Sequence, residues 1–395
     1  RQAGLFGMII SNKWMRADYG KPLRKLLTQD VRLLRLIDFG SVQVFKTATV
    51  DTNILIARKD PPHNTLQACR FTLDYAFGTP LDTHIATHEI TMPTPDADTV
   101  WNVSDRNTFD LTQAIHRVGK PLRDWTITRK DTLGNEVEVE AVKMNYGIKT
   151  GYNKAFIVTS EEKQAILDKA TAAGESMEHY EAVFKPILEG KHIKKFRAAW
   201  EELWVIFIPW HFPLHKDESI KGASSTAENA FEKQYPILYH YFNAHKGELS
   251  NRNKAETGIR YEWYALQRCA ASYYPEFDKP KLIWGNLNVN AAFSVDTEGM
   301  YINAPANMLT SERDDIKYLG AVLNSRVTSF MMRQIAYSRE HGYLEYKKVF
   351  VEQMPVPELE AAERRPFEVL MDYILWLYDD SKDPISEQAT NQEIA

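Results

Sequence analysis

The chain has 395 residues, 44% of them hydrophobic and 12% aromatic, so it can build cores and is not disordered throughout. Its length predicts two or three domains. The formal net charge is −5, but residues 352–395 hold 11 acidic and 3 basic side chains, which leaves the rest slightly basic. Net charge therefore neither requires nor excludes a nucleic-acid partner, and cations must act as local clusters.

Cysteine usage and hydropathy favour an intracellular protein. The two cysteines, Cys69 and Cys269, are far apart and form no CxxC pair. This argues against a structural zinc site or a disulfide framework and fits a reducing compartment. The apolar stretch 5–10 is too short to cross a bilayer, and no secretory signal pattern is visible. We expect a cytoplasmic protein without membrane contact.

The N-terminal pattern predicts a piece of an α/β sheet. Residues 4–11 are a short apolar run that predicts a buried strand, and Asn12 is placed to cap the helix that follows. Residues 31–38 and 42–58 predict two more strands. Strand, helix, strand, strand is only a fragment of such a sheet, because a doubly wound domain begins with its own first strand and glycine-rich turn.

The later segments alternate helical and strand patterns and show no internal repeat. Residues 133–136 predict the turn of a surface hairpin. The polar residues after the last helix predict a disordered tail. The predicted helices are residues 108–118, 161–172, 235–249, 312–333 and 362–380, and residues 281–310 predict short strands with turns.

A polar turn near the middle of the chain is the strongest candidate site. In Gly147–Phe156 (GIKTGYNKAF), two glycines bracket a Lys-Thr pair, and a strand-like apolar pair follows. Such a turn exposes backbone N–H groups, a hydroxyl and an ammonium together, which suits an anionic backbone. Lys149, Thr150, Asn153 and Lys154 are therefore candidate DNA contacts. The alternative is a plain surface turn that leads into a strand.

Three further clusters are candidates for phosphate or base contacts. Each has an ordinary alternative, because lysine clusters are commonly solvated, arginines form surface ion pairs, and glycine-containing loops stabilise turns. These candidates are Lys191, Lys194, Lys195, Arg252, Lys254, Arg260, Arg339, His341 and Tyr343.

Other uses of the polar and aromatic residues are less well supported. A metal site is not expected, because Pro213 interrupts the pair His211 and His215 and no carboxylate completes a ligand set. A nuclease site is not expected either, since Pro95-Asp96 and Glu161–Lys163 are separated by the predicted hairpin and the polar turn. Four aromatic residues crowd together and are expected in core or inter-domain packing rather than on a base-stacking platform. They are Trp200, Trp204, Trp210 and Phe212.

Several stretches, taken in their order and spacing, resemble one family. GLFGMIISNKWMRADYGKPLRKLL (4–27) resembles the late strand-and-helix segment of N6-adenine DNA methyltransferases of restriction–modification systems. IDFGSVQVFKTATVDTNILIARK (37–59) is similar to the sheet edge that follows it. Three later stretches resemble the TaqI-like C-terminal specificity domain. They are NYGIKTGYNKAFIV (145–158), PILEGKHIKKF (186–196), and LNSRVTSFMMRQ with GYLEYKKVFVEQMPVPE (323–358).

The resemblance implies that the chemical apparatus lies upstream. Family members carry a glycine-rich S-adenosylmethionine loop and an Asn/Asp-Pro-Pro-aromatic tetrapeptide before the strand that matches residues 4–11, and this chain contains neither. Asp60–His63 (DPPH) is a decoy, because histidine replaces the aromatic ring and the segment lies on the wrong side of the match. The intact enzyme is expected to use S-adenosylmethionine, whereas this chain is expected to bind no cofactor and to transfer no methyl group.

One residue of the base pocket is implied by the same resemblance. The family places an aromatic ring on the sheet edge to stack on the flipped-out adenine, and Phe45 in VQVFKTATV matches this position. A base that reacts must first leave the duplex, and a ring face can hold it. The alternative for Phe45 is an ordinary core position.

We therefore predict a mixed α/β (α+β) chain in four parts. Residues 1–60 are the truncated end of a Rossmann-like methyltransferase sheet, 61–145 a connecting region, 146–360 a target-recognition domain, and 361–395 a C-terminal helix with a polar tail. The expected function is sequence-specific recognition of double-stranded DNA, with no catalysis by this chain alone. An N-terminal methyltransferase or nuclease domain outside the chain is a further candidate partner. The alternative is a stand-alone DNA-specificity or protein-interaction module without an enzymatic parent.

Overall fold

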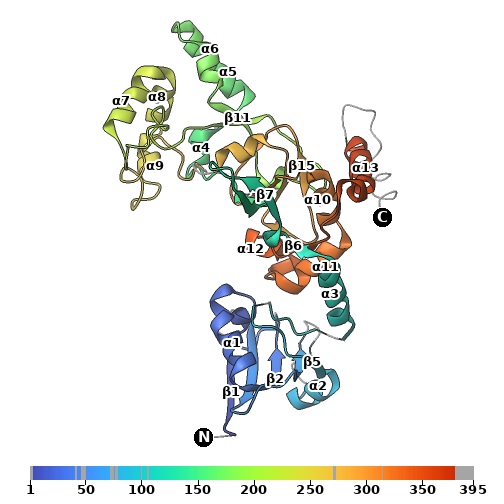
Figure 1. Ribbon diagram of the computed structural model, residues 1–395. Coiled ribbons are helices and arrows are strands. Elements are labelled where there is room, and N and C mark those ends of the chain that lie inside the picture. The colour runs from blue at the N-terminus through green and yellow to red at the C-terminus, as the bar shows by residue number, and fades with distance from the viewer. Residues whose placement is uncertain are drawn as a thin grey trace. The chain divides into compact units, whose positions relative to one another are not determined.

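The computed structural model describes residues 3–40, 42–45, 50–71, 75, 79–98, 100–104, 106–269, 273–313 and 315–378 (Figure 1). The chain forms two compact units. Unit 1 consists of Arg1–Gly119 with Arg333–Glu340, and unit 2 consists of Lys120–Met332 with His341–Ala395. The predicted mixed α/β class is confirmed. A short late segment belongs to the N-terminal unit, which no local pattern in the sequence indicates.

Unit 1 is built on a five-stranded sheet in the order β1-β3-β2-β4-β5. β3 is antiparallel to β1 and β2, β4 is parallel to β2, and β5 is antiparallel to β4. The strands are β1 (Leu5–Ser11), β2 (Arg32–Asp38), β3 (Thr52–Arg58), β4 (Thr65–Arg70) and β5 (Ile90–Pro93). β4 and β5 continue the sheet past residue 60, so the expected connecting region begins inside unit 1 and ends inside unit 2.

The strand expected over residues 4–11 is confirmed, but its expected burial is wrong. β1 pairs with β3 alone, and within the described residues no strand pairs with its other edge. Leu5, Phe6, Met8 and Ile9 are all exposed along it. Unpaired backbone groups and apolar side chains on one edge are a template for a further strand.

Two local expectations in unit 1 need correction. Asn12 does not cap the helix that follows β1, because its buried amide donates to Asp38 Oδ1 at 2.9 Å. The strand expected over 42–58 is shorter, since residues 42–45 form no strand and β3 begins at Thr52. The helices of unit 1 are η1 (Asn12–Met15), η2 (Asp18–Gly20), α1 (Lys21–Gln29), α2 (Leu81–His88) and α3 (Arg106–Val118).

Unit 2 contains two four-stranded sheets among its described residues, in the orders β10-β12-β11-β16 and β15-β13-β17-β9. The predicted hairpin is confirmed as the pair β7 and β8. The strands are β6 (Lys120–Pro121), β7 (Thr126–Lys130), β8 (Glu136–Glu140), β9 (Val142–Tyr146), β10 (Ile157–Thr159), β11 (Phe184–Leu188), β12 (Leu203–Ile206), β13 (Lys281–Trp284), β14 (Leu287–Asn288), β15 (Ser294–Asp296), β16 (Tyr301–Ile302), β17 (Asn307–Ser311), β18 (Leu344–Glu345) and β19 (Pro355–Val356).

The predicted helices are all present, but two of them are divided. The helix expected over 312–333 breaks because the buried Asn324 side chain bonds the main chain, with Nδ2 donating to Phe293 O at 2.8 Å and Oδ1 accepting from Phe293 N at 2.9 Å. The helix expected over 235–249 is divided into α8 (Pro236–Asn243) and α9 (Lys246–Ser250). The tail expected to be disordered lies outside the described residues. The remaining helices are η3 (Leu122–Asp124), α4 (Asn153–Phe156), α5 (Ser160–Ala172), α6 (Met177–Glu181), η4 (Gly190–His192), α7 (Ser225–Gln234), α8 (Pro236–Asn243), α9 (Lys246–Ser250), η5 (Tyr274–Asp278), α10 (Ile316–Leu323), α11 (Arg326–Ile335), η6 (Glu340–Gly342), α12 (Lys348–Val351) and α13 (Ala361–Leu377). No helix in the described part of the chain is long and apolar enough to span a membrane.

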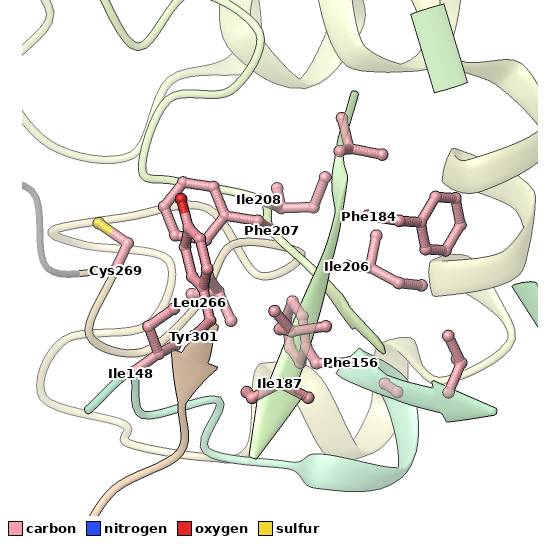
Figure 2. Packing of buried hydrophobic residues seen from close by; sticks show 14 of the residues in the cluster. Ile148, Phe156, Phe184, Ile187, Ile206, Phe207, Ile208, Leu266, Cys269 and Tyr301 are labelled. Carbon is pink, nitrogen blue, oxygen red and sulfur yellow. The ribbon is translucent and has the colours of Figure 1, made fainter. Parts of the chain in front are cut away.

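The main core of unit 2 joins segments that are far apart in the sequence. Figure 2 shows Ile148, Phe156, Leu266 and Tyr301 among the buried residues of this cluster. Ile148 and Phe156, which lie near the two ends of the polar turn, therefore anchor the turn in this core. The crowded aromatics also pack here, as expected: Phe212 within the cluster, and Trp200, Trp204 and Trp210 partly buried against it.

A carboxylate network fastens the β7–β8 hairpin to unit 2. Glu312 accepts hydrogen bonds from Arg129 Nη2 at 2.6 Å, Lys143 Nζ at 3.2 Å and Lys279 Nζ at 3.1 Å. Burial by itself would raise the pKa of Glu312, but the hydrogen bonds and nearby cations outweigh burial and lower the pKa to about 2.

This network predicts a loss of stability in acid. A carboxyl group whose pKa is lowered by folding stabilises the fold above its unfolded pKa, and the contribution is lost as the pH falls through the folded value. We expect Tm to fall between about pH 4.5 and pH 2, and Glu312→Gln to remove part of that fall while lowering Tm at pH 7. Calorimetry across this range tests it, with the exposed Glu298→Gln as control. Parallel curves for Glu312→Gln and the wild type would contradict the prediction.

Candidate nucleic-acid interface

The backbone of the polar turn is fixed against unit 2. Ile148 N donates to Ile302 O at 2.8 Å, and Ile148 O accepts from Ala304 N at 2.8 Å. Gly147 lies so close to this segment that a Cβ atom there would be 2.6 Å from Ile302 O. Only glycine therefore fits at this position without moving the backbone, which accounts for the first glycine of the motif.

The four candidate residues of the turn divide into exposed and internal members. Lys149, Asn153 and Lys154 have exposed side chains. Thr150 is buried, and its hydroxyl donates to Asn153 Oδ1 at 2.5 Å. Thr150 is therefore a structural residue that orients Asn153, and we correct its assignment as a direct DNA contact.

Arg252 is partly buried, and it joins the turn to two other segments of the chain. Its guanidinium donates to four main-chain oxygens. They are Leu249 O at 2.9 Å, Thr150 O at 2.6 Å, Trp263 O at 2.6 Å and Ala265 O at 2.8 Å. Burial lowers the pKa of Arg252 to about 10. Four of its five N–H groups donate within the chain, which favours a structural role, and its assignment as a DNA contact stays a prediction.

Two exposed arginines are held by one carboxylate beside the turn. Glu256 Oε1 accepts from Arg260 Nη1 at 3.0 Å and from Arg268 Nη2 at 3.1 Å, while Oε2 accepts from Asn253 Nδ2 at 2.8 Å. The Glu256 side chain is only 12% exposed, whereas those of Arg260 and Arg268 are 55% and 53% exposed. We call Glu256, Arg260 and Arg268 the arginine fork.

The fork is joined to the polar turn through the backbone. Arg268 N donates to Lys149 O at 2.9 Å, and Lys149 N donates to Arg268 O at 3.1 Å, so these two residues are paired. Lys254 is exposed and follows Asn253, whose side chain donates a hydrogen bond to the Glu256 carboxylate. We call this surface the turn face. Its exposed members are Lys149, Asn153, Lys154, Lys254, Arg260 and Arg268.

The lysine cluster around η4 is separate from this set. Lys191 is paired with Glu189 at 3.0 Å, and this carboxylate raises the pKa of Lys191. Lys195 lies 4.8 Å from the ring centre of Phe196, and its pKa is lowered by burial. Lys194 is exposed. Among the described residues no recorded contact links the cluster to the turn face, so its role stays a prediction.

The boundary between the two units passes through the late loop, and the DNA contacts expected of its three candidate residues stay predictions. Arg339 is exposed and belongs to unit 1, whereas His341 and Tyr343 belong to unit 2. His341 has a φ of +57°, in the left-handed region that is uncommon for residues other than glycine and in which histidine is among the enriched types. Tyr343 is also exposed.

Phe45 lies on the connection between β2 and β3 and not on a sheet-edge strand. Its side chain is 42% exposed, which excludes the ordinary core position. The connection leaves the sheet at Asp38, which is fully buried and whose Oδ1 accepts from Asn12 Nδ2 at 2.9 Å and Gly40 N at 3.1 Å. Asp38 therefore fixes the point from which the connection that carries Phe45 departs.

Two pairs of histidines stand four residues apart in the sequence, His84 with His88 and His211 with His215, and their members have ordinary structural contacts. The rings of His84 and His88 stack at 4.1 Å, and His211 Nδ1 lies 2.9 Å from Glu262 Oε1. Within the described ranges, no group of three or more His, Cys, Asp or Glu residues is arranged to hold a metal ion.

Two family models match the chain. Residues 185–356 match the TaqI-like C-terminal specificity domain, and residues 1–45 match the Eco57I restriction-modification methylase. The chain is a homologue of type II restriction–modification methyltransferases. The family resemblance of the sequence is thereby confirmed. The first match contains the arginine fork and Lys254, whereas the polar turn lies before its start.

The related proteins are longer than this chain. RM.Eco57I of Escherichia coli, a type II restriction enzyme and methyltransferase, is 23% identical over 340 residues, which are 82% of this chain and 32% of that protein. M.BstVI of Geobacillus stearothermophilus, a type II methyltransferase, is 20% identical over 385 residues, which are 94% of this chain and 61% of that protein. The chain thus spans about one third to three fifths of these relatives.

A solved structure shares the fold. The type IIL restriction–modification enzyme MmeI, solved in complex with DNA, is similar with a TM-score of 0.50 and 12% sequence identity. The similarity covers 98% of this chain and 43% of that one. At this identity the likeness concerns the fold alone.

Sequence reasoning missed the two residues that organise the turn face. The sequence alone marks neither of them, because Arg268 is an isolated cation beside an apolar stretch and Glu256 is one acid among many. The spacing of Asn253, Glu256 and Arg260 gives a weak signal, because residues three and four apart meet on one helical turn. Arg268 has no such local signal, since it reaches Glu256 only through the fold.

The two arginines Arg252 and Arg260 are expected to respond differently to the same substitution. Arg252→Met leaves buried carbonyl oxygens without donors, so we expect a loss of about 2–4 kcal/mol in the free energy of unfolding. Arg260→Met removes an exposed ion pair, and we expect a loss below about 1 kcal/mol. Urea denaturation of both variants measures this. Equal losses would contradict the structural role of Arg252.

Proposed function

We propose that unit 2 binds double-stranded DNA through the turn face and is the DNA-reading part of a restriction–modification methyltransferase. The observation that carries the proposal is the turn face itself. It gathers five exposed cations with a single acidic partner, on a backbone fixed by Arg252 and the Ile148 pairing. The match of residues 185–356 to a specificity domain supports the same reading.

The turn face provides the two kinds of contact that DNA recognition needs. Lys149, Lys154 and Lys254 are exposed point charges, which suit phosphate oxygens and make binding sensitive to salt. Asn153 presents an amide whose oxygen is already oriented by Thr150, and asparagine can pair with an adenine edge. Phosphate contacts would set the position of the protein, and base contacts would set the sequence.

We infer that unit 1 is the end of a methyltransferase sheet. The exposed apolar edge of β1 supports this, because such an edge is normally paired or covered, and the relatives are longer than this chain. We assign the strands that would pair with this edge to a part of the intact protein outside this sequence. The S-adenosylmethionine loop and the catalytic tetrapeptide are assigned to the same part. In that protein the product would be N6-methyladenine, and Phe45 would stack on the extruded base. No residue of this chain is assigned to S-adenosylmethionine.

The salt dependence of DNA binding tests the function of unit 2. We expect the chain to bind duplexes of random sequence at low salt and to lose affinity steeply as salt rises. Lys149→Ala and Lys154→Ala should each reduce the slope of log K against log salt by about 0.9 per lost phosphate contact. Fluorescence anisotropy with labelled duplexes measures the slopes.

The control is Lys169→Ala on α5, an exposed lysine outside the turn face, which should leave the slope unchanged. Absent or salt-insensitive binding at low salt would contradict DNA binding by this chain. Equal slopes for all three variants and the wild type would remove the polar turn from the interface.

A further inference from the structure

The carboxylate of the arginine fork reduces the net charge of the two arginines and also holds their side chains in place. Two guanidinium groups share one carboxylate, so the three residues together carry a single positive charge. A pair of cations meant only for phosphate gains nothing from an acid between them, because a carboxylate repels phosphate and weakens binding. Glu256 is nevertheless nearly buried and accepts three side-chain hydrogen bonds.

The carboxylate instead fixes where the arginines point. Arg260 and Arg268 each donate one N–H to the same Oε1 atom, so their guanidinium groups lie side by side. Of the five N–H groups on an arginine, four remain on each for another partner. Arg260 also lies 5.6 Å over the ring of Trp210, whose indole N–H donates to Leu266 O at 2.9 Å. Glu256 thus lowers the net charge of the fork and fixes the orientation of both guanidinium groups. This arrangement suits a hydrogen-bonded base edge better than a phosphate.

We propose that Arg260 and Arg268 read guanine in the major groove, and that Glu256 is the positioning residue that sets their direction. The proposal rests on the function proposed for unit 2 and names the bases that it reads. Arginine pairs bidentately with O6 and N7 of guanine, the commonest specific contact to a base. Because the two guanidinium groups are adjacent, the guanines belong to neighbouring base pairs, about 3.4 Å apart along the helix.

The lysines of the turn face have the complementary role. Lys149 is paired through its backbone with Arg268, and Lys254 adjoins Asn253 of the fork network. Neither ammonium is assigned an ion pair in the described structure, so their full charge is available to phosphates on either side of the guanines. The lysines of the turn face would therefore position the protein on the DNA backbone, and the two arginines would read the bases.

The test is selection from a pool of duplexes with a randomised central segment, using the full chain and sequencing the retained DNA. We expect an enriched sequence with guanines at two neighbouring base pairs. Arg260→Gln and Arg268→Gln should each abolish the preference at one of them, about a tenfold or larger loss of selectivity, and keep the rest of the sequence. Arg268→Lys keeps the positive charge but lacks the planar guanidinium group. This variant should therefore lose the preference for guanine and keep the salt dependence of binding.

Glu256→Gln separates a positioning role from a merely structural one. The amide keeps the shape but removes the charge that holds both arginines, so the preference should fall at both base pairs. Affinity for random duplex should stay equal or rise, because the surface gains one net positive charge. A merely structural role would lower affinity for all sequences together with Tm. Lys254→Gln is the matched control, and should weaken binding to every sequence alike without changing the selected bases.

Two results would overturn the inference. If the fork variants change only the salt slope and leave the enriched sequence intact, the arginines contact phosphates, and the function proposed for unit 2 still stands. If the wild-type chain binds DNA but enriches no sequence with neighbouring guanines, the fork is not a guanine reader. Failure of the wild type to bind any duplex would remove the inference together with the function on which it rests.

Discussion

The guanidinium of Arg252 is the constraint on which the turn face depends. Four main-chain oxygens from α9, the polar turn and the segment 263–265 converge on this one cation. None of these segments is a regular neighbour of another in a sheet, so without the arginine their carbonyl groups would be buried and unsatisfied. The same side chain passes beside Gly151, where a Cβ atom would lie 2.8 Å from Arg252 Cδ. The same Cβ would lie 2.7 Å from Gln267 Oε1, and Gly151 has a φ of +77°, so both the backbone and its neighbours favour the second glycine of the motif.

This arrangement separates the groups that hold the turn from the side chains that would contact DNA in the proposed function. Backbone hydrogen bonds, Arg252 and the buried apolar residues Ile148 and Phe156 hold the turn in place. The side chains that face solvent, from Lys149 to Arg268, carry little of the stability and can be exchanged at low cost. A specificity domain needs this separation, because its target can then change through surface residues without loss of the fold.

Local pattern predicted the elements well and the site only in part. Strands, helices and the hairpin follow from apolar periodicity and turn residues, and the order of motifs indicated the family. The exposure of β1 escaped prediction because an apolar run looks the same whether its partners are present or not. Arg252 and Arg260 could not be told apart from the sequence, since each is an arginine in a polar turn. Only the fold shows that one donates inward to carbonyl groups and the other projects outward from Glu256.

Hydrogen exchange of the full chain, with and without duplex DNA at low salt, tests the central claim most directly. Amides of the segments that carry the turn face, residues 147–156 and 252–268, should become protected when DNA is added, and the protection should disappear at high salt. Protection confined to other regions, such as β1 or α13, would contradict the account, as would exchange that DNA leaves unchanged throughout the chain.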